Sequence, residues 1–293
     1  MTTKGCRNAL IKEYYHLTKP GIIRGNLIST IAGFLLASKG QISVGLFVAT
    51  LLGISLVIAS ACVFNNYIDR DIDHKMARTK KRALVSGAIS GRHALIYASI
   101  LGAGGELMLV IYTNWLTAVI ALFGFAMYVV VYGIWKRRST LGTIVGSVSG
   151  ATPPVIGYCA VTGRLDSAAV LLFLILVFWQ MPHFFAIAMY RLKDYSAAGL
   201  PVLPVKKGIQ TTKIQMLLYT LGFALFTVML TALGYTGRVY LGVALAISIS
   251  WTVLCVQGFR VSDDLRWARQ MFFFSLFALT LLCATISVDH FLP

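Results

Sequence analysis

The sequence predicts an all-α polytopic membrane protein with about nine transmembrane helices. Of its 293 residues, 58% are hydrophobic and only 12% are charged, which is about half the charge of a typical soluble domain. Because so little charge cannot cover a water-facing surface, lipid must face most of this chain. Its apolar residues also gather in runs long enough to cross a bilayer, and these runs lack the alternation of barrel strands.

Nine apolar runs follow one another, each near the ~20 residues that a helix needs to cross a ~30 Å hydrocarbon core. They lie at 21–38, 43–64, 93–112, 115–135, 141–161, 167–190, 213–235, 239–258 and 269–288. Helices are expected because each helix bonds its own backbone polar groups internally. Residues 1–20 are more polar and predict a cytoplasmic N-terminal segment, ahead of a single transmembrane domain at 21–290.

The 26 Lys and Arg residues divide unevenly between the two sides of these runs. Only Lys39, Arg164 and Arg238 lie on one side, and the other 23 lie on the side that holds the N-terminal segment. Because positive loops stay in the cytoplasm, the N-terminus is predicted there and the C-terminus outside, in a bacterial inner membrane. The net charge of +16 is then a topology and lipid-contact signal, and no nucleic-acid partner is expected because no recognition motif accompanies it.

Three aspartates lie within five positions after the second run. If its helix continues, Asn66, Asp69 and Asp73 share one face, and Asp71 points away. Oxygen ligands of this kind suit Mg²⁺, which bridges protein carboxylates to substrate phosphates. The pattern predicts a Mg²⁺ site, with a solvated, salt-bridged loop as the alternative.

Basic residues next to the aspartates supply the counter-charge that a diphosphate needs. The candidate diphosphate contacts are Arg70, Lys80 and Arg82. A cation site beside a basic cluster at the membrane surface fits an amphiphilic substrate with a diphosphate head. Near the start of the first run, Arg24 and Asn26 are candidates to face the same site, although Arg24 is also placed to snorkel toward lipid phosphate.

A second polar constellation closes the sixth run. The spacing of His183, Tyr190 and Asp194 predicts one shared helix face, with His183 about 16 Å deeper than Asp194. An ionisable group at mid-membrane is a candidate functional residue, although a histidine that only links two helices would show the same pattern. Pro182 predicts a kink or a freed carbonyl in this helix.

The stretch from Asn65 to Asp73 resembles the first aspartate-rich motif of the UbiA-type membrane prenyltransferases, N-D-x-x-D-x-x-x-D. Asn66 stands in place of the first aspartate, and Asp69 and Asp73 match the other two. The family's second motif, D-x-x-x-D, is matched only at its end. Asp194 takes that place, and Tyr190 replaces the first aspartate.

These departures, together with four further segments, resemble the branch of the family that acts on haem. The segments are Thr18–Gly21, Pro153–Tyr158, Trp179–His183 and Pro201–Val205. The resemblance covers nearly the whole chain. It implies a helical bundle around a central cavity that opens to the cytoplasmic side, with the aspartate motifs at its mouth.

The resemblance also implies the reaction, which is transfer of the farnesyl group of farnesyl diphosphate to the 2-vinyl group of haem B with addition of water. Haem B is then a substrate, and Mg²⁺ is the cofactor. The implied metal ligands are Asp69, Asp73, Asn66 and Asp194. The other implied partners are membrane lipid and, downstream, haem A synthase or the assembly of a terminal oxidase.

Two further roles concern the walls of the implied cavity. Aromatic side chains offer π faces to an allyl cation, and the candidates are Tyr67, Trp179 and Tyr190. His183 is a candidate haem contact or the base for water addition. The alternatives are a prenyltransferase acting on a quinone precursor or another lipid, and a secondary transporter, which predicts inverted repeats.

Overall fold

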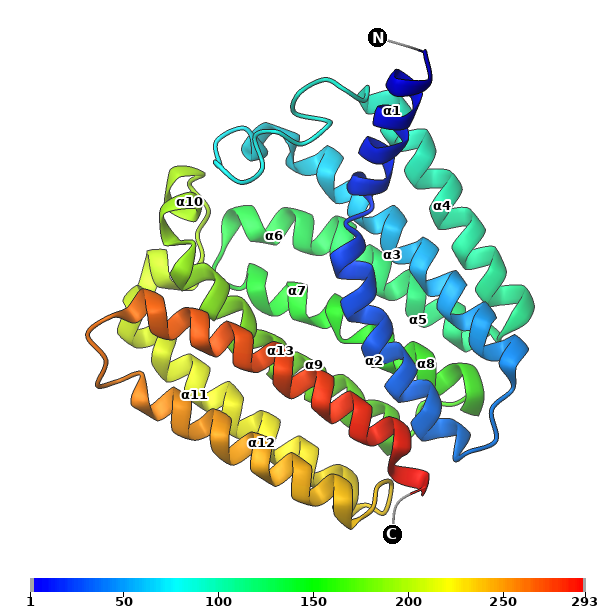
Figure 1. Ribbon diagram of the computed structural model, residues 1–293, viewed down its shortest axis with the longest axis vertical. Coiled ribbons are helices and arrows are strands. Elements are labelled where there is room, and N and C mark those ends of the chain that lie inside the picture. The colour runs from blue at the N-terminus through cyan, green and yellow to red at the C-terminus, as the bar shows by residue number, and fades with distance from the viewer. Residues whose placement is uncertain (1–2, 292–293) are drawn as a thin grey trace.

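The computed structural model describes residues 3–291, with side chains from Leu10 to His290, and every regular element in this range is helical. Nine helical segments among the described residues are long and apolar enough to cross a membrane, which confirms the predicted count. Figure 1 shows them packed side by side in one bundle. Seven of the segments are α2 (Pro20–Ser38), α3 (Val44–Asp73), α4 (Gly91–Tyr112), α9 (Ser167–Tyr190), α11 (Leu203–Ala232), α12 (Arg238–Gln257) and α13 (Asp264–Val288).

The other two spans are assembled from shorter pieces. The fourth consists of α5 (Trp115–Ala126), the π-helix η1 (Met127–Tyr132) and α6 (Gly133–Arg138), and the fifth consists of α7 (Gly142–Gly150) and α8 (Thr152–Thr162). Two prolines open α8, where the first helical N–H groups need no partner within the helix. The remaining elements are α1 (Thr3–Leu17), α10 (Leu192–Ala197) and η2 (Asp289–Phe291).

Several helices differ from the predicted apolar runs. The second run continues as a helix to Asp73, which is the condition on which the predicted acidic face depends. The seventh span begins at Leu203, ten residues early, and Gly208 interrupts it with a φ of +81°. Pro182 lies inside α9, and the helix continues past it to Tyr190.

Glycine allows α2 and α8 to cross in direct contact. A Cβ atom at Gly33 would lie 2.0 Å from the carbonyl oxygen of Pro154, and one at Gly157 would lie 2.1 Å from that of Thr30. Because such separations are shorter than any side chain permits, only glycine fits at these two positions. The crossing holds the broken fifth span in the middle of the bundle.

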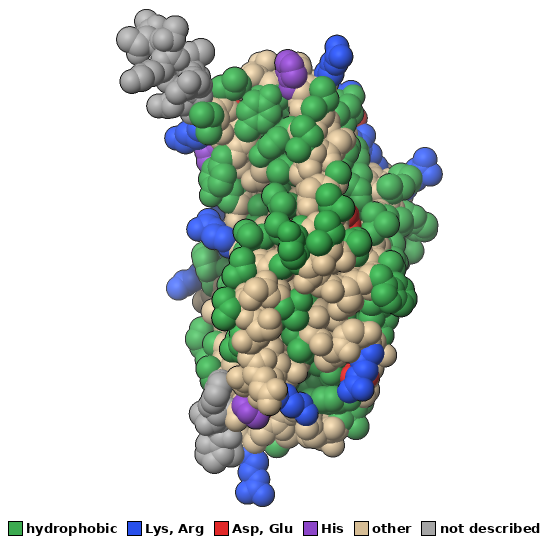
Figure 2. All heavy atoms as spheres, turned by 90° about the vertical axis from the view of Figure 1, so that its right-hand side faces the viewer, with side chains coloured by type: hydrophobic (Ala, Val, Ile, Leu, Met, Phe, Trp, Pro, Cys, Tyr) green, Lys and Arg blue, Asp and Glu red, His purple; other side chains and the backbone are tan. Residues whose placement is uncertain are grey.

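The outer surface is that of an integral membrane protein. Large apolar side chains face outward along the spans, among them Ile100, which is 66% exposed, and Phe273, which is 65% exposed. Figure 2 shows hydrophobic side chains spread across one lateral face, with few charged groups among them. So much exposed apolar surface is unfavourable in water, but it is favourable in contact with lipid hydrocarbon.

Candidate active site

A cavity of about 570 Å³ lies inside the bundle, between α2, α3, the fourth and fifth spans, α9 and α13. Most of its wall is apolar or aromatic. At one end of the wall lie Arg78, from the loop after α3, and Lys136, from α6. Along α9, the wall includes Trp179, Gln180 and His183. The cavity therefore combines a cationic end with an apolar interior.

The end of α3 carries the predicted acidic face. Asn66, Asp69 and Asp73 are all buried, whereas the side chain of Asp71 is 59% exposed. The positions i, i+3 and i+7 lie on one side because the helix continues through the whole motif. The helix therefore places the side chains of Asn66, Asp69 and Asp73 together, as the sequence predicted.

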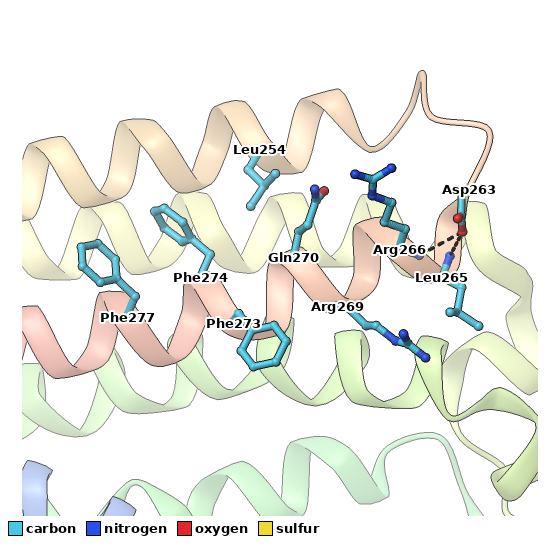
Figure 3. A pocket seen from close by; sticks show the side chains of 9 residues that line it. All are labelled: Leu254, Asp263, Leu265, Arg266, Arg269, Gln270, Phe273, Phe274 and Phe277. Atoms are coloured by element: carbon cyan, nitrogen blue, oxygen red, sulfur yellow. Dashed lines mark hydrogen bonds between the residues drawn. The ribbon is translucent and has the colours of Figure 1, made fainter.

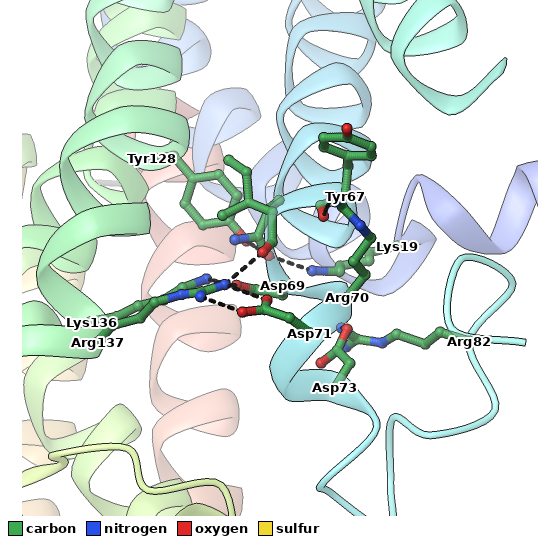
Figure 4. Close-up of polar contacts among 12 residues, drawn as sticks. Lys19, Tyr67, Asp69, Arg70, Asp71, Asp73, Arg82, Tyr128, Lys136 and Arg137 are labelled. Atoms are coloured by element: carbon green, nitrogen blue, oxygen red, sulfur yellow. Dashed lines mark hydrogen bonds and ion pairs between the residues drawn. The ribbon is translucent and has the colours of Figure 1, made fainter. Parts of the chain in front are cut away.

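Each of the two buried carboxylates contacts a base from another part of the chain, as Figure 4 shows. Lys136 Nζ lies 2.5 Å from the carboxylate of Asp69. Arg82 Nη1 lies 2.6 Å from Asp73 Oδ2. These two acids are thus neutralised by cations of a kind that also binds phosphate oxygens.

Lys136 and Arg137, two of the three cations of α6, are residues that the sequence did not single out. Arg137 Nη1 lies 2.7 Å from Asp71 Oδ2, and Arg137 Nη2 lies 3.6 Å from Asp69 Oδ1. The available signal was the basic run Lys136-Arg137-Arg138, which follows the fourth apolar run on the same predicted side as the aspartates. Charge pattern alone does not say which basic segment folds over which acid.

Lys19 is a third unpredicted cation of this cluster, after Lys136 and Arg137. Its Nζ donates to Asn65 Oδ1 at 2.8 Å, and the hydroxyl of Tyr128 donates to the same oxygen at 3.4 Å. Lys19 has a φ of +51°, which is unusual for a residue other than glycine and marks a constrained position. Desolvation lowers the pKa of the Lys19 ammonium to about 8. The sequence motif Thr18–Gly21 contains Lys19, but the motif did not indicate that Lys19 would contact Asn65.

The α3 residues provide donors that fit a hard cation. Asn66 Nδ2 donates to the carbonyl of Leu17 at 2.8 Å, while Asn66 Oδ1 is buried and has no hydrogen-bond partner among the described residues. An unpaired buried acceptor beside two carboxylates suits Mg²⁺, whose remaining ligands are usually waters and substrate oxygens. Within the described residues, however, no three His, Cys, Asp or Glu side chains are grouped as a metal site. The oxygen ligands that α3 offers to a cation are the side chains of Asp69, Asp73 and Asn66.

The end of α9 does not extend this cluster as the spacing predicts. The helix stops at Tyr190, and Arg191 is not helical, with a φ of −107° and a ψ of 21°. The predicted common face is therefore wrong for Asp194, whereas His183 and Tyr190 both lie on α9 and both pack against Phe272. Asp194 lies on α10, where its nearest base is Arg191 at 4.0 Å, and the ring of Tyr190 packs edge-on against Phe272 at 5.6 Å.

Other predicted residues take different positions around the site. The guanidinium of Arg70 lies 4.0 Å above the ring of Tyr67, and neither residue lines the cavity. Lys80 and Arg24 are exposed to the surroundings. Asn26 does line the cavity, with its Nδ2 donating to a carbonyl of its own helix at 2.8 Å. The geometry thus favours Asn26 among these residues.

His183 lies in the cavity wall and also links two helices. Its Nδ1 is 2.7 Å from Ser275 Oγ on α13, and its ring stacks on Trp179 with centroids 4.8 Å apart. The hydroxyl of Ser275 donates to the carbonyl of Phe272 at 2.6 Å, so it accepts from Nδ1–H of the histidine. The Nε2 atom is then the unprotonated nitrogen. His183 thus makes an interhelical hydrogen bond and also lines the cavity.

Comparison with known proteins identifies the class. Residues 26–277 match the UbiA prenyltransferase family, and the chain belongs to this family of membrane prenyltransferases. A protoheme IX farnesyltransferase of Yersinia pseudotuberculosis serotype O:1b is 56% identical over 281 residues, which cover 96% of this chain and 95% of the relative. One from Sodalis glossinidius is 54% identical over 286 residues, which cover 97% and 96% of the two chains.

Solved structures share the fold at low sequence identity. A digeranylgeranylglyceryl phosphate synthase superposes with a TM-score of 0.81 at 18% identity, covering 96% of this chain and 99% of the other. A UbiA homologue from Archaeoglobus fulgidus, bound to GPP and Mg²⁺, gives a TM-score of 0.71 at 17% identity, covering 94% and 99%. The helical bundle is therefore the fold of the family.

Proposed function

We propose that this chain transfers the farnesyl group of farnesyl diphosphate to the 2-vinyl group of haem B, with addition of water, and releases haem O and diphosphate. The observation that carries the proposal is an apolar, aromatic cavity whose wall includes Lys136, the ion-pair partner of Asp69. Relatives at 54–56% identity over nearly the whole chain carry the corresponding name. That likeness favours haem over a quinone precursor, and the family assignment favours an enzyme over a transporter.

The diphosphate end of the substrate belongs at the ion-pair cluster. Lys136 and Arg82 pair with Asp69 and Asp73, and a diphosphate offers the same cations more negative charge. Mg²⁺ bound by Asp69, Asp73 and Asn66 would neutralise charge on the leaving diphosphate. The two basic side chains would then turn from the carboxylates to phosphate oxygens. The bond broken is the one between the farnesyl carbon and its oxygen.

The cavity wall next to this end supplies aromatic faces. Tyr128 and Tyr132 stack with ring centroids 5.6 Å apart and an interplanar angle of 17°, and both line the cavity. They lie one turn apart on η1, and π-helical turns often occur at functional sites. We assign to them the stabilisation of the allyl cation, for which the sequence suggested Tyr67, Trp179 and Tyr190. The apolar wall keeps water away until the new carbon–carbon bond has formed.

His183 belongs to the acceptor end of the cavity. Its unprotonated Nε2 is the form of imidazole that ligates haem iron or accepts a proton from the adding water. The hydrogen bond to Ser275 fixes this tautomer and the orientation of the ring. We favour the haem contact, because Trp179 stacks beside the histidine and adds a flat apolar surface for a porphyrin.

The reaction is tested by expressing the chain in a bacterium that lacks its own enzyme of this kind, and by mass analysis of the extracted haems. We expect a haem whose mass exceeds that of haem B by one farnesyl group and one hydroxyl group. Prenylated quinone without prenylated haem would contradict the proposal.

We also propose that the aspartate cluster lies on the cytoplasmic side, with haem A synthase or oxidase assembly as the consumer of the product. Cysteine labelling of residues 74–90 from the outside would contradict this orientation.

A further inference from the structure

A groove on the outer surface of α13 is separate from the cavity of the proposed reaction. Its polar part consists of Asp263, Arg266, Arg269 and Gln270, at the start of the helix. Its apolar part consists of Leu254 on α12 and Leu265, Phe273, Phe274 and Phe277 on α13. Figure 3 shows Arg266 and Gln270 on the side of α13 that faces α12, and Arg269 and Phe273 on the other side. The groove is therefore polar at one end and aromatic along its length.

The two arginines of the groove lack an acidic partner. Among the described residues, no ion pair joins Arg266 or Arg269 to a carboxylate. The one acid in the groove, Asp263, is engaged as the N-cap of α13, where it accepts from the backbone N–H groups of Leu265 at 3.1 Å and Arg266 at 2.9 Å. The neighbouring Asp264 pairs with Lys213 at 2.5 Å. The groove thus keeps a net positive charge, because its two arginines outnumber its one carboxylate.

The spacing of these residues matches the dimensions of a membrane lipid. Arg266, Gln270, Phe273 and Phe277 follow one another along the outward face of α13, at i, i+4, i+7 and i+11, with Phe273 on the side away from α12. At 1.5 Å per residue, Phe277 lies about 16 Å deeper than Arg266, close to half of the ~30 Å hydrocarbon core. Phe273 and Phe277 are 65% and 56% exposed and belong to a membrane span. The aromatic part of the groove therefore faces acyl chains, and the arginines lie at headgroup level.

We propose that this groove binds a phospholipid with a net negative headgroup. Guanidinium groups form paired hydrogen bonds with phosphate oxygens, and the phenylalanines hold the acyl chains along α13. A zwitterionic lipid should bind less tightly, because the positive group of its headgroup would be repelled by the two arginines. The groove begins at the same end of the bundle as the aspartate cluster, since both lie between an even span and the next odd span. The proposal does not rest on the proposed reaction.

The test compares two lipids on the purified full-length protein. In detergent, the protein is titrated with phosphatidylglycerol or phosphatidylcholine, and bound lipid is counted by native mass spectrometry. We expect the wild type to bind phosphatidylglycerol roughly tenfold more tightly, the scale for two arginines at a membrane surface. The double variant Arg266→Gln/Arg269→Gln should bind both lipids alike. Arg260→Gln is the matched control, because Arg260 is exposed beside the groove but does not line it, and it should keep the preference.

Three results would overturn the proposal. The first is an unchanged preference for phosphatidylglycerol in the double variant, and the second is no preference in the wild type. The third is evidence for a different occupant. In that case the double variant would lose dimerisation, or would lose haem binding measured by absorbance, while its lipid binding stays the same. A thermal unfolding curve of each variant checks that the exposed substitutions leave the fold intact.

Discussion

The ends of α3 and α9, where the two aspartate-rich motifs of the family fall, have different surroundings. At the end of α3, the carboxylates of Asp69 and Asp73 are buried and lie against bases from α6 and from the following loop. Beyond α9, Asp194 lies on a separate short helix, and its one ion pair within the described residues is a 4.0 Å contact with Arg191. The contribution of α9 comes from deeper in the membrane, where Trp179 and His183 line the cavity. Under the proposed function, the end of α3 would contact the diphosphate and the middle of α9 would contact the acceptor.

The reason for this difference is where each helix ends. Because α3 continues to Asp73 without interruption, its acidic face stays in register, and the next loop folds back so that Arg82 reaches the last aspartate. By contrast, α9 ends at Tyr190, and the turn at Arg191 rotates α10 away from the helical register of α9. An acidic pattern therefore forms a site only where the backbone keeps it on one face.

The largest expected effect is on the buried acids of α3. Asp69→Asn and Asp73→Asn should each lower haem farnesylation by about 100-fold or more, the scale for losing a main electrostatic group of an active site. Product haem is measured by mass, and thermal unfolding checks the fold. Asp71→Asn is the control, since its side chain is 59% exposed and it should be far milder. Near-normal activity in both buried variants would mean that Asp69 and Asp73 only form structural salt bridges and do not take part in the reaction.

Lys136→Gln should come next. It removes one charge-assisted hydrogen bond, so we expect the KM for farnesyl diphosphate to rise about 10- to 100-fold. Arg138→Gln is matched in charge and position, but Arg138 is exposed and does not line the cavity. If the two variants behave alike, Lys136 is only a structural partner of Asp69.

His183→Ala separates the two ends of the cavity. Haem farnesylation should fall about 10- to 100-fold, as when a metal ligand or its support is lost, while binding of farnesyl diphosphate stays near that of the wild type. Ser275→Ala is the matched control, because it removes the interhelical hydrogen bond and keeps the imidazole. Weakening of both substrates together, with an equal loss of thermal stability in both variants, would make His183 a packing residue.

The smallest expected effect is at the end of α9. Asp194→Asn should change activity by less than about fivefold, since a partly exposed ion pair of this kind contributes little. The measurement is the Mg²⁺ concentration that gives half-maximal activity. A large rise in that concentration would show that Asp194 joins the metal ligands when substrate binds, and the contrast between the two helix ends would then fail.

The sequence by itself determined the class of protein, the nine spans and the acidic face of α3. Run length and hydropathy decide a membrane span, and helical periodicity decides which residues of one helix share a face. Only the tertiary structure decided which cations meet that face and which aromatic side chains line the cavity. Lys136, Lys19 and Tyr128 come from distant segments, and the π-helical turn of η1 sets the direction of the tyrosine. Periodicity orients residues around one helix axis, but packing alone fixes how the helices are rotated against one another.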